Sequence, residues 1–375
     1  MDKLAEFAFS FLEEIPVRIF EILLYLAAII AAVPALAYLF HRYHKIELKP
    51  DVTHYFKTAD GWMVALLEYR PAGGKAKFKY PVICCHGLSG NHYGFDFSEE
   101  LSIVRYLAAR GHHVFAIDLR GAGESEKIGL LSHKRYQWNF DSYSRYDIPV
   151  CIDGALRISG AAKLHWVGHS MGGMLGYAIA QHKEIGKKLV SVTAMCSPGK
   201  LDQFKVFLFA RPVLERFRRF YLGQLIQLYT PLAERIPALM KLMGFENLRP
   251  GHYCRAAANL TEDIPVALLK QFGEWAEKGV VVSGDGMDYL KGLASLKQPF
   301  CVFAADKDLS APPDSVRDIF EAIGSKIKSF HPMGVQYGHK DHYGHLTPLI
   351  GKDALEECYP LLAQWLEKGF KGAKK

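Results

Sequence analysis

The chain has 375 residues, half of them hydrophobic, and a formal net charge of +7. This length allows one large core with an inserted segment, and this hydrophobic content excludes long-range disorder. The lysine and arginine residues are scattered rather than gathered into a basic stripe, so we expect no nucleic-acid partner. The seven cysteines contain no C-x-x-C pair and are odd in number, which argues against a complete disulfide framework and favours a reducing compartment.

Residues 1–50 are expected to form a hydrophobic membrane-anchor segment. The run Ile22–Phe40 carries no charge, and as a helix it would be about 28 Å long, close to the roughly 30 Å hydrocarbon core of a bilayer. Tyr25 and Tyr38 lie near its ends, where interfacial aromatic residues are common. Pro34 predicts a kink, which membrane helices tolerate.

Two other interpretations of this run stay open: a helix packed against the domain or a partner, and a cleaved signal peptide. The triplet 35–37 (Ala-Leu-Ala) resembles a cleavage site, but the flank before the run is acidic, whereas signal peptides need a basic one. Arg42, Lys45 and Lys49 follow the run. By the positive-inside rule they predict a cytoplasmic catalytic body.

From Val52 onward, short apolar runs alternate with longer amphipathic ones. Residues 53–71 predict a hairpin with Asp60 and Gly61 in its turn. Five apolar runs predict buried strands, at 80–87, 112–121, 163–170, 189–198 and 299–308. Amphipathic runs predict helices at 102–111, 148–160 and 171–182. Strands alternating with helices predict an α/β fold with a mostly parallel sheet covered on both faces.

About a hundred residues interrupt this alternation. Residues 197–296 are rich in Phe, Leu, Tyr and Arg and have a helical pattern. We therefore expect a helical cap at 197–296, inserted before a late strand, and an α/β catalytic domain formed by residues 51–196 and 297–375.

A serine lies between a predicted buried strand and a predicted helix. Gly168-His169-Ser170-Met171-Gly172 matches G-x-S-x-G in the strand–turn–helix context that this motif requires. The turn needs a strained serine backbone, and side chains two positions to either side would collide. It also exposes the hydroxyl at a helix N-terminus, whose N–H groups favour negative charge. Ser170 is therefore the predicted nucleophile, and a glycine-rich helix start packed on the sheet is the structural alternative.

A serine nucleophile needs donors for the oxyanion that forms on its substrate. The backbone N–H groups of Leu88, after the first parallel strand, and of Met171 are predicted to face the same oxygen. His86 precedes Leu88, and we expect it to shape this loop rather than to act as a base.

The serine also needs a base and an acid that orients it. Asp306 and Asp308 end the predicted strand at 299–308, and we favour Asp308 because Asp306 lies closer to the strand and would serve the turn. His339, His342 and His345 follow in one loop. We favour His345, because it directly precedes an apolar segment that leads into the last helix.

The predicted catalytic residues occur in the order Ser170, Asp308, His345. This is the order of α/β-hydrolases, unlike that of chymotrypsin or subtilisin. The three histidines near Asp341 would also suit a metal site, but their spacing is not that of a compact ligand set. No metal or cofactor is expected.

The chain resembles the α/β-hydrolase superfamily, from about Thr53 to Leu366. Segments such as HGLSG, DLRGAGES, GHSMGG and GKDALEECYPLLAQWL are similar to blocks of its acid-lipase-like members. The run 140–156 also resembles polyhydroxyalkanoate synthases, which have a cysteine where this chain has Ser170. Related dehalogenases and epoxide hydrolases have an aspartate there. The resemblance implies an ester or lipid substrate.

These observations predict a membrane-anchored serine esterase or lipase that acts through an acyl-enzyme on Ser170. One alternative is an acyltransferase, which passes the same acyl group to an alcohol. Another is an inactive hydrolase fold that serves as a membrane-bound scaffold.

Overall fold

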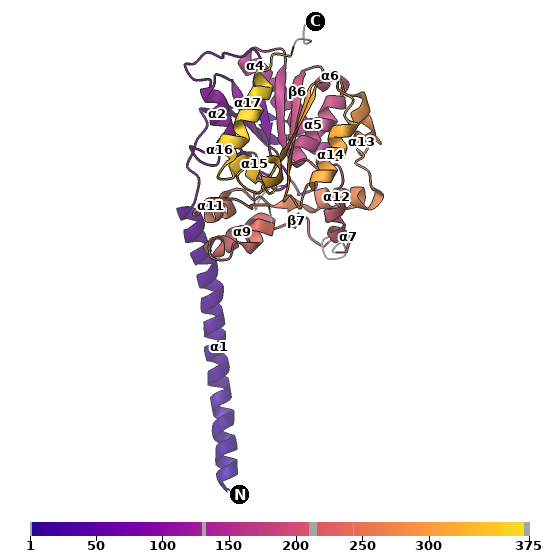
Figure 1. Ribbon diagram of the computed structural model, residues 1–375. Helices are drawn as coiled ribbons and strands as arrows, with labels where there is room; N and C mark the ends of the chain where they lie inside the picture. Colours follow the sequence, from indigo (N-terminus) through magenta and orange to yellow (C-terminus); the bar gives the residue numbers. More distant parts are fainter. Residues whose placement is uncertain (1, 130–132, 210–215, 243, 371–375) are drawn as a thin grey trace.

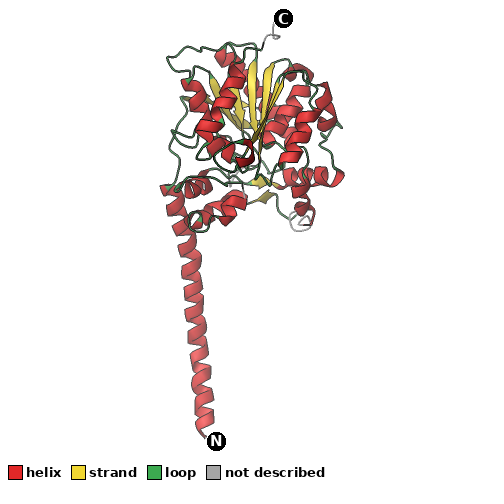
Figure 2. Cartoon of the chain, viewed as in Figure 1, coloured by secondary structure: helices red, strands yellow, loops and turns green. Residues whose placement is uncertain are grey.

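The computed structural model describes residues 2–129, 133–209, 216–242 and 244–370. Its body is built around an eight-stranded sheet with the order β1-β2-β4-β3-β5-β6-β9-β10, and helices cover both faces of the sheet (Figure 1, Figure 2). A single long helix, α1, extends away from this body and carries the N-terminus (Figure 1). The predicted α/β architecture is confirmed.

Six neighbouring strands of the sheet are parallel. They are β3 (Val82–Cys85), β4 (Val114–Asp118), β5 (Leu164–His169), β6 (Leu189–Met195), β9 (Phe300–Ala305) and β10 (Lys328–Met333). At one edge, β1 (Val52–Lys57) and β2 (Met63–Tyr69) form the predicted hairpin, and β2 pairs antiparallel with β4. Gly61 adopts a φ of 89° in the hairpin turn. The strand β10 is the one that the hydrophobic pattern did not predict.

Alternate residues of the buried strands belong to two cores on opposite faces. In β3, Ile83 and Cys85 pack with α4 (Ile148–Ser159), α5 (Met171–Gln181) and α14 (Pro313–Ala322). Val82 and Cys84 pack with α2 (Ile103–Ala109) and α17 (Tyr359–Glu367). This alternation is what a strand buried on both faces produces.

Short helices and turns complete the catalytic body. They are η1 (His92–Gly94), α3 (Phe140–Ser142), η2 (Tyr143–Asp147), α6 (Lys183–Gly186), η6 (Val335–Tyr337), α15 (Thr347–Ile350) and α16 (Ala354–Glu357). The seven cysteines all lie in described segments, and each is buried and without a disulfide partner.

Most of the segment between β6 and β9, here called the cap, lies at the end of the body next to α1, whereas its last helices pack beside α5 and α14 (Figure 1). Its larger helices are α9 (Leu222–Tyr229), α11 (His252–Asn259) and α12 (Val266–Lys278). Its shorter elements are η3 (Asp202–Lys205), α7 (Val206–Phe209), η4 (Thr230–Leu232), α10 (Ala238–Leu242), α13 (Tyr289–Gly292) and η5 (Leu293–Ser295). It also contains a two-stranded sheet that the helical pattern did not predict, formed by β7 (Arg219–Phe220) and β8 (Ile264–Pro265).

The helix α1 spans Asp2–Tyr43 and passes through Pro34 without a break, so the predicted kink does not divide it. Its described part Ile19–Tyr43 is long and apolar enough to cross a membrane, with a mean hydropathy of 2.4 in its most apolar window. Most of that window is exposed. An apolar helix near the N-terminus is compatible with an anchor or with a signal sequence.

Candidate active site

Ser170 lies at the turn between the end of β5 and the start of α5. Its φ of 53° and ψ of −120° lie outside the regions that L-residues prefer. A Cβ atom on Gly168 would overlap the carbonyl of Gly172, and one on Gly172 would overlap the carbonyl of Cys85. These contacts explain why the motif has glycines on both sides of the serine. The strained turn leaves the Ser170 side chain facing a cavity.

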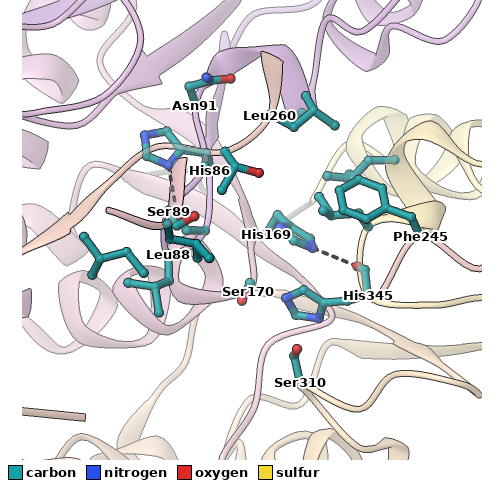
Figure 3. Close-up of a pocket in the computed structure, with 18 of the residues that line it drawn as sticks. His86, Leu88, Ser89, Asn91, His169, Ser170, Phe245, Leu260, Ser310 and His345 are labelled. Carbon is teal, nitrogen blue, oxygen red and sulfur yellow. Dashed lines mark hydrogen bonds between the residues drawn. The ribbon is translucent and has the colours of Figure 1, made fainter. Parts of the chain in front are cut away.

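Asp308 and His345 form a buried pair beside this turn. His345 Nδ1 donates to Asp308 Oδ2 across 2.7 Å. Asp308 Oδ1 accepts from the backbone N–H groups of Ser310 and Ala311 at 2.8 and 2.7 Å. These three hydrogen bonds hold the carboxylate and the His345 ring in one orientation, with Nε2 as the ring nitrogen that is not bonded to Asp308. Figure 3 shows this ring next to the Ser170 hydroxyl.

A second Asp–His pair lies nearby, and neither of its residues lines the cavity that Ser170 faces. His342 Nδ1 donates to Asp306 Oδ2 across 2.5 Å, and the Tyr343 N–H donates to Asp306 Oδ1 across 2.8 Å. Asp306 therefore ties the end of β9 to the loop that carries His345. The third histidine of that loop, His339, contacts the backbone of Gly334.

Leu88 and Met171, the predicted oxyanion-hole residues, border one small cavity together. Leu88 also lines the larger cavity that Ser170 faces. Within the described residues, the backbone N–H of neither Leu88 nor Met171 donates to another protein group.

Two buried histidines hold the backbone around the serine. The Leu119 N–H donates to His86 Nε2 at 3.1 Å, so His86 Nδ1 carries the proton that it donates to the Gly87 carbonyl. His169 Nε2 donates to the carbonyl of His345 across 2.8 Å (Figure 3). Burial lowers the pKa of the His86 and His169 side chains, and that of His169 lies well below its ordinary value. Both rings are therefore neutral donors at physiological pH.

The cavity in front of Ser170 measures about 210 Å³ and is bordered by both the catalytic body and the cap. Its larger apolar lining residues are Leu88, Phe95, Phe204, Leu222, Phe245, Leu260, Ile264, Leu346 and Leu349. The polar residues that line it include Ser170, His169 and His345 (Figure 3), and also His86, Ser89, Asn91, Thr261 and Ser310. Such a site suits a substrate with an apolar part and a polar reacting group.

Glu262, in the cap, fixes the cap to the loop that follows β3. Its backbone N–H donates to the Ser89 carbonyl at 2.7 Å. Its carboxylate accepts from Asn91 Nδ2 at 3.0 Å and from the Gly123 N–H at 2.9 Å. No sequence motif marks Glu262. His169 lies inside the G-x-S-x-G motif, but the motif does not predict its hydrogen bond to the backbone of His345.

The structure separates the residues of the alternative metal site. His345, His342 and His339 each contact a different partner, as described above. Across the described segments, no group of three or more His, Cys, Asp or Glu side chains is arranged to hold a metal ion.

Comparison with known proteins places this geometry in a family. Residues 80–351 match the family described as the alpha/beta hydrolase fold. The chain belongs to this family. It is 30% identical over 357 residues to gastric triacylglycerol lipase of Bos taurus, covering 83% of this chain and 86% of the lipase. Human lipase member K is 24% identical, covering 85% of this chain and 87% of the relative.

A solved structure of a bacterial membrane phospholipase A shares the fold, with a TM-score of 0.53 at 14% identity. It covers 95% of this α/β hydrolase and 98% of the phospholipase chain. Residues 44–375 make up less than nine-tenths of the chain, so this match includes part of α1. The family and its lipase relatives together support carboxylic ester hydrolysis as the activity of the chain.

Proposed function

We propose that the chain is a membrane-anchored serine hydrolase that cleaves lipophilic carboxylic esters. In this proposal residues 1–50 anchor the enzyme, and residues 51–196 and 297–375 form the catalytic domain on the cytoplasmic side. Residues 197–296 form a cap over the substrate.

Acylation begins with attack of Ser170 Oγ on the acyl carbonyl carbon. His345 Nε2 accepts the hydroxyl proton, and Asp308 holds the ring in the required tautomer and stabilises the imidazolium. The oxyanion accepts hydrogen bonds from the N–H groups of Leu88 and Met171. Collapse of the tetrahedral intermediate breaks the ester C–O bond, and His345 returns its proton to the leaving alcohol.

Deacylation repeats these steps with water. His345 takes a proton from the water, whose oxygen attacks the acyl-enzyme carbonyl through a second oxyanion. The intermediate then releases the carboxylic acid, and Ser170 Oγ regains its proton from His345.

The observation that carries the proposal is the buried Asp308–His345 pair next to a serine on a strained strand-to-helix turn. A purely structural role in the turn would not require an oriented imidazole next to the serine hydroxyl, whereas nucleophilic catalysis does. The apolar cavity walls favour a lipophilic acyl group. The exposed apolar helix α1 favours a membrane anchor, and Arg42, Lys45 and Lys49 favour the cytoplasmic side for the body.

A fluorophosphonate probe tests the nucleophile directly, because it forms a stable covalent bond with an activated serine. We expect the probe to label the full-length protein and to leave Ser170→Ala unlabelled. Ser125, which bonds to the backbone at the end of β4, provides the control Ser125→Ala, which we expect to be labelled. Equal labelling of Ser170→Ala and the unaltered protein would refute the assignment.

A further inference from the structure

The cap exposes a group of large apolar side chains close to α1. Six of them are between 38% and 55% exposed, and they are called here the outer cap face: Tyr221, Leu225, Leu228, Leu232, Ile236 and Leu239. They lie on α9, η4, α10 and the adjoining turns. Single exposed leucines are ordinary on soluble proteins, but six large apolar side chains within residues 221–239 indicate a surface that meets something apolar.

The same cap helices contact the end of α1. Among the described elements, α1 packs mainly against α9, η4 and α11 (Figure 1). Ala37 is only 8% exposed, whereas its neighbours Leu36 and Tyr38 are 50% and 60% exposed. The packing therefore begins inside the apolar run of α1 and not beyond it.

Asn259, at the end of α11, fixes this junction. Its Nδ2 donates to the carbonyl of His44 at 2.9 Å, and its Oδ1 accepts from the N–H of Ile46 at 2.9 Å. Both bonds hold the residues that directly follow α1. The cap and the end of α1 therefore keep a fixed relative position.

This geometry sets the depth of the cap if α1 crosses a bilayer. Ala37 precedes Phe40, the last residue of the apolar run, by only about 4.5 Å along the helix. The helices α9 and η4, which pack at this level, must then reach the membrane surface. The charges agree, because residues 216–242 contain five basic residues (Arg216, Arg218, Arg219, Arg235 and Lys241) and one acidic residue (Glu234). Anionic headgroups attract such a surface.

The helix α9 also borders the catalytic cavity. Leu222 lines the cavity, whereas Leu225, one turn further along the helix, is exposed on the outer cap face. We propose that the outer cap face inserts into the leaflet beside α1, so that the ester passes from the bilayer into the cavity next to α9. This inference rests on the proposed membrane anchor and names the surface from which the enzyme takes its substrate.

Insertion depth can be measured with an environment-sensitive fluorophore on single cysteines. The native cysteines are all buried, so a surface cysteine is labelled selectively. The full-length protein would carry either Leu228→Cys or the control Ile327→Cys. It would be placed in vesicles of phosphatidylcholine and phosphatidylglycerol that contain a spin-labelled lipid as quencher. Ile327 is similarly exposed but directly precedes β10, on the catalytic body.

We expect lipid quenching at Leu228→Cys and none at Ile327→Cys. Equal quenching at the two positions would overturn the inference. A label at Leu26→Cys reports on α1 itself. Quenching there without quenching at Leu228→Cys leaves the anchor intact and refutes only the outer cap face, whereas absence of quenching at Leu26→Cys refutes both.

Activity gives a second, independent readout. The quantity to measure is the ratio of turnover on a long-chain ester in the vesicles to turnover on soluble nitrophenyl butyrate. We expect the double variant Leu228→Glu with Ile236→Glu to lower this ratio by at least about tenfold, because carboxylates resist insertion into the membrane. The matched pair Tyr55→Glu, on β1, with Ile327→Glu, directly before β10, should leave this ratio unchanged. An unchanged ratio in the cap variant would overturn the inference. Loss of soluble-ester turnover in Ser170→Ala tests the proposed chemistry separately.

Discussion

Two Asp–His pairs join the end of β9 to the loop before α15, and only one of them has its histidine in the lining of the Ser170 cavity. Asp308→Asn should lower kcat for a nitrophenyl ester by about 10⁴-fold, because an amide favours the wrong imidazole tautomer of His345. Asp306→Asn should retain most of the activity, because Asp306 bonds to His342 and to the Tyr343 backbone instead. Steady-state kinetics of the two variants, with unfolding midpoints measured alongside, checks this difference. The reverse result would make Asp306 the acid.

His169 holds the backbone of His345 through a hydrogen bond. It should therefore affect kcat by positioning His345 and not by reacting with the substrate. His169→Phe keeps a ring in the buried site but removes the donor to the His345 carbonyl. Losing a buried hydrogen bond costs about 1–3 kcal/mol, so we expect kcat to fall about tenfold with KM nearly unchanged. His169→Gln, which can still donate, should restore part of the rate. A change in KM alone, or no rescue by glutamine, would contradict this role.

Residues whose roles depend on their immediate neighbours could be predicted from the sequence, whereas those set by distant contacts could not. The turn at Ser170 follows from glycines two positions away. His169 has its role only because the chain returns at His345, and Asn259 only because α11 packs against the end of α1. Asn259 begins an Asn-Leu-Thr triplet, but its side chain is buried and occupied by the bonds to His44 and Ile46.

At the scale of elements, a buried ion pair joins β4 to η1 behind the active-site loop. His92 Nδ1 lies 2.7 Å from Asp118 Oδ2, and the His92 N–H donates to Asp118 Oδ1. Burial by itself would lower the pKa of His92, but the Asp118 carboxylate outweighs it and raises that pKa. Burial likewise opposes ionisation of Asp118, yet the His92 ring holds the pKa of that carboxyl below its usual range.

These shifts predict a defined pH window for the contribution of the pair to stability. The raised pKa of His92 stabilises the fold fully below about pH 6.5, and this contribution is lost as pH rises through the folded-state pKa. The lowered pKa of Asp118 stabilises the fold above about pH 3.9 and is lost at more acidic pH. His92→Gln should therefore lower the free energy of unfolding by about 3 kcal/mol near pH 6.

The difference should shrink between pH 6 and pH 9, as the pH rises through the raised pKa of His92 and its ring loses its proton. Denaturant unfolding at both pH values measures it, with His182→Gln, at an exposed histidine, as the control. A destabilisation that is independent of pH would show that His92 contributes by packing rather than by charge.

The positions of the strands could be predicted from the sequence where each strand is buried along its whole length. The strands β3 to β6 and β9 are fully buried, so their hydrophobic runs are continuous. The edge strand β10 is only half-buried and contains Lys328, His331 and Pro332, so no apolar run marks it. The short β7–β8 pair, two residues in each strand, falls below any periodic signal.

At the scale of the whole molecule, α1 and the cap pack against each other, although they are far apart in the sequence. The hydrophobic run and the cap insertion were both predicted, but their contact depends on Ala37 packing against the cap and on Asn259 more than two hundred residues away. Contacts over such separations have no local signature. In the proposed membrane-anchored enzyme, these contacts decide which end of the body faces the membrane.

The packing at this junction favours the proposed anchor over a cleaved signal peptide. The peptide bond after Ala37 lies where α1 packs on the cap, so a processing enzyme would have to reach a buried residue within a helix. We expect the protein purified from cells to retain residues 1–43 by intact mass, and to stay with membranes after an alkaline wash. A variant lacking residues 2–36 should be released by the same wash. Recovery of a mature chain that begins at Tyr38, or release of the full-length protein, would show that α1 is not a permanent anchor.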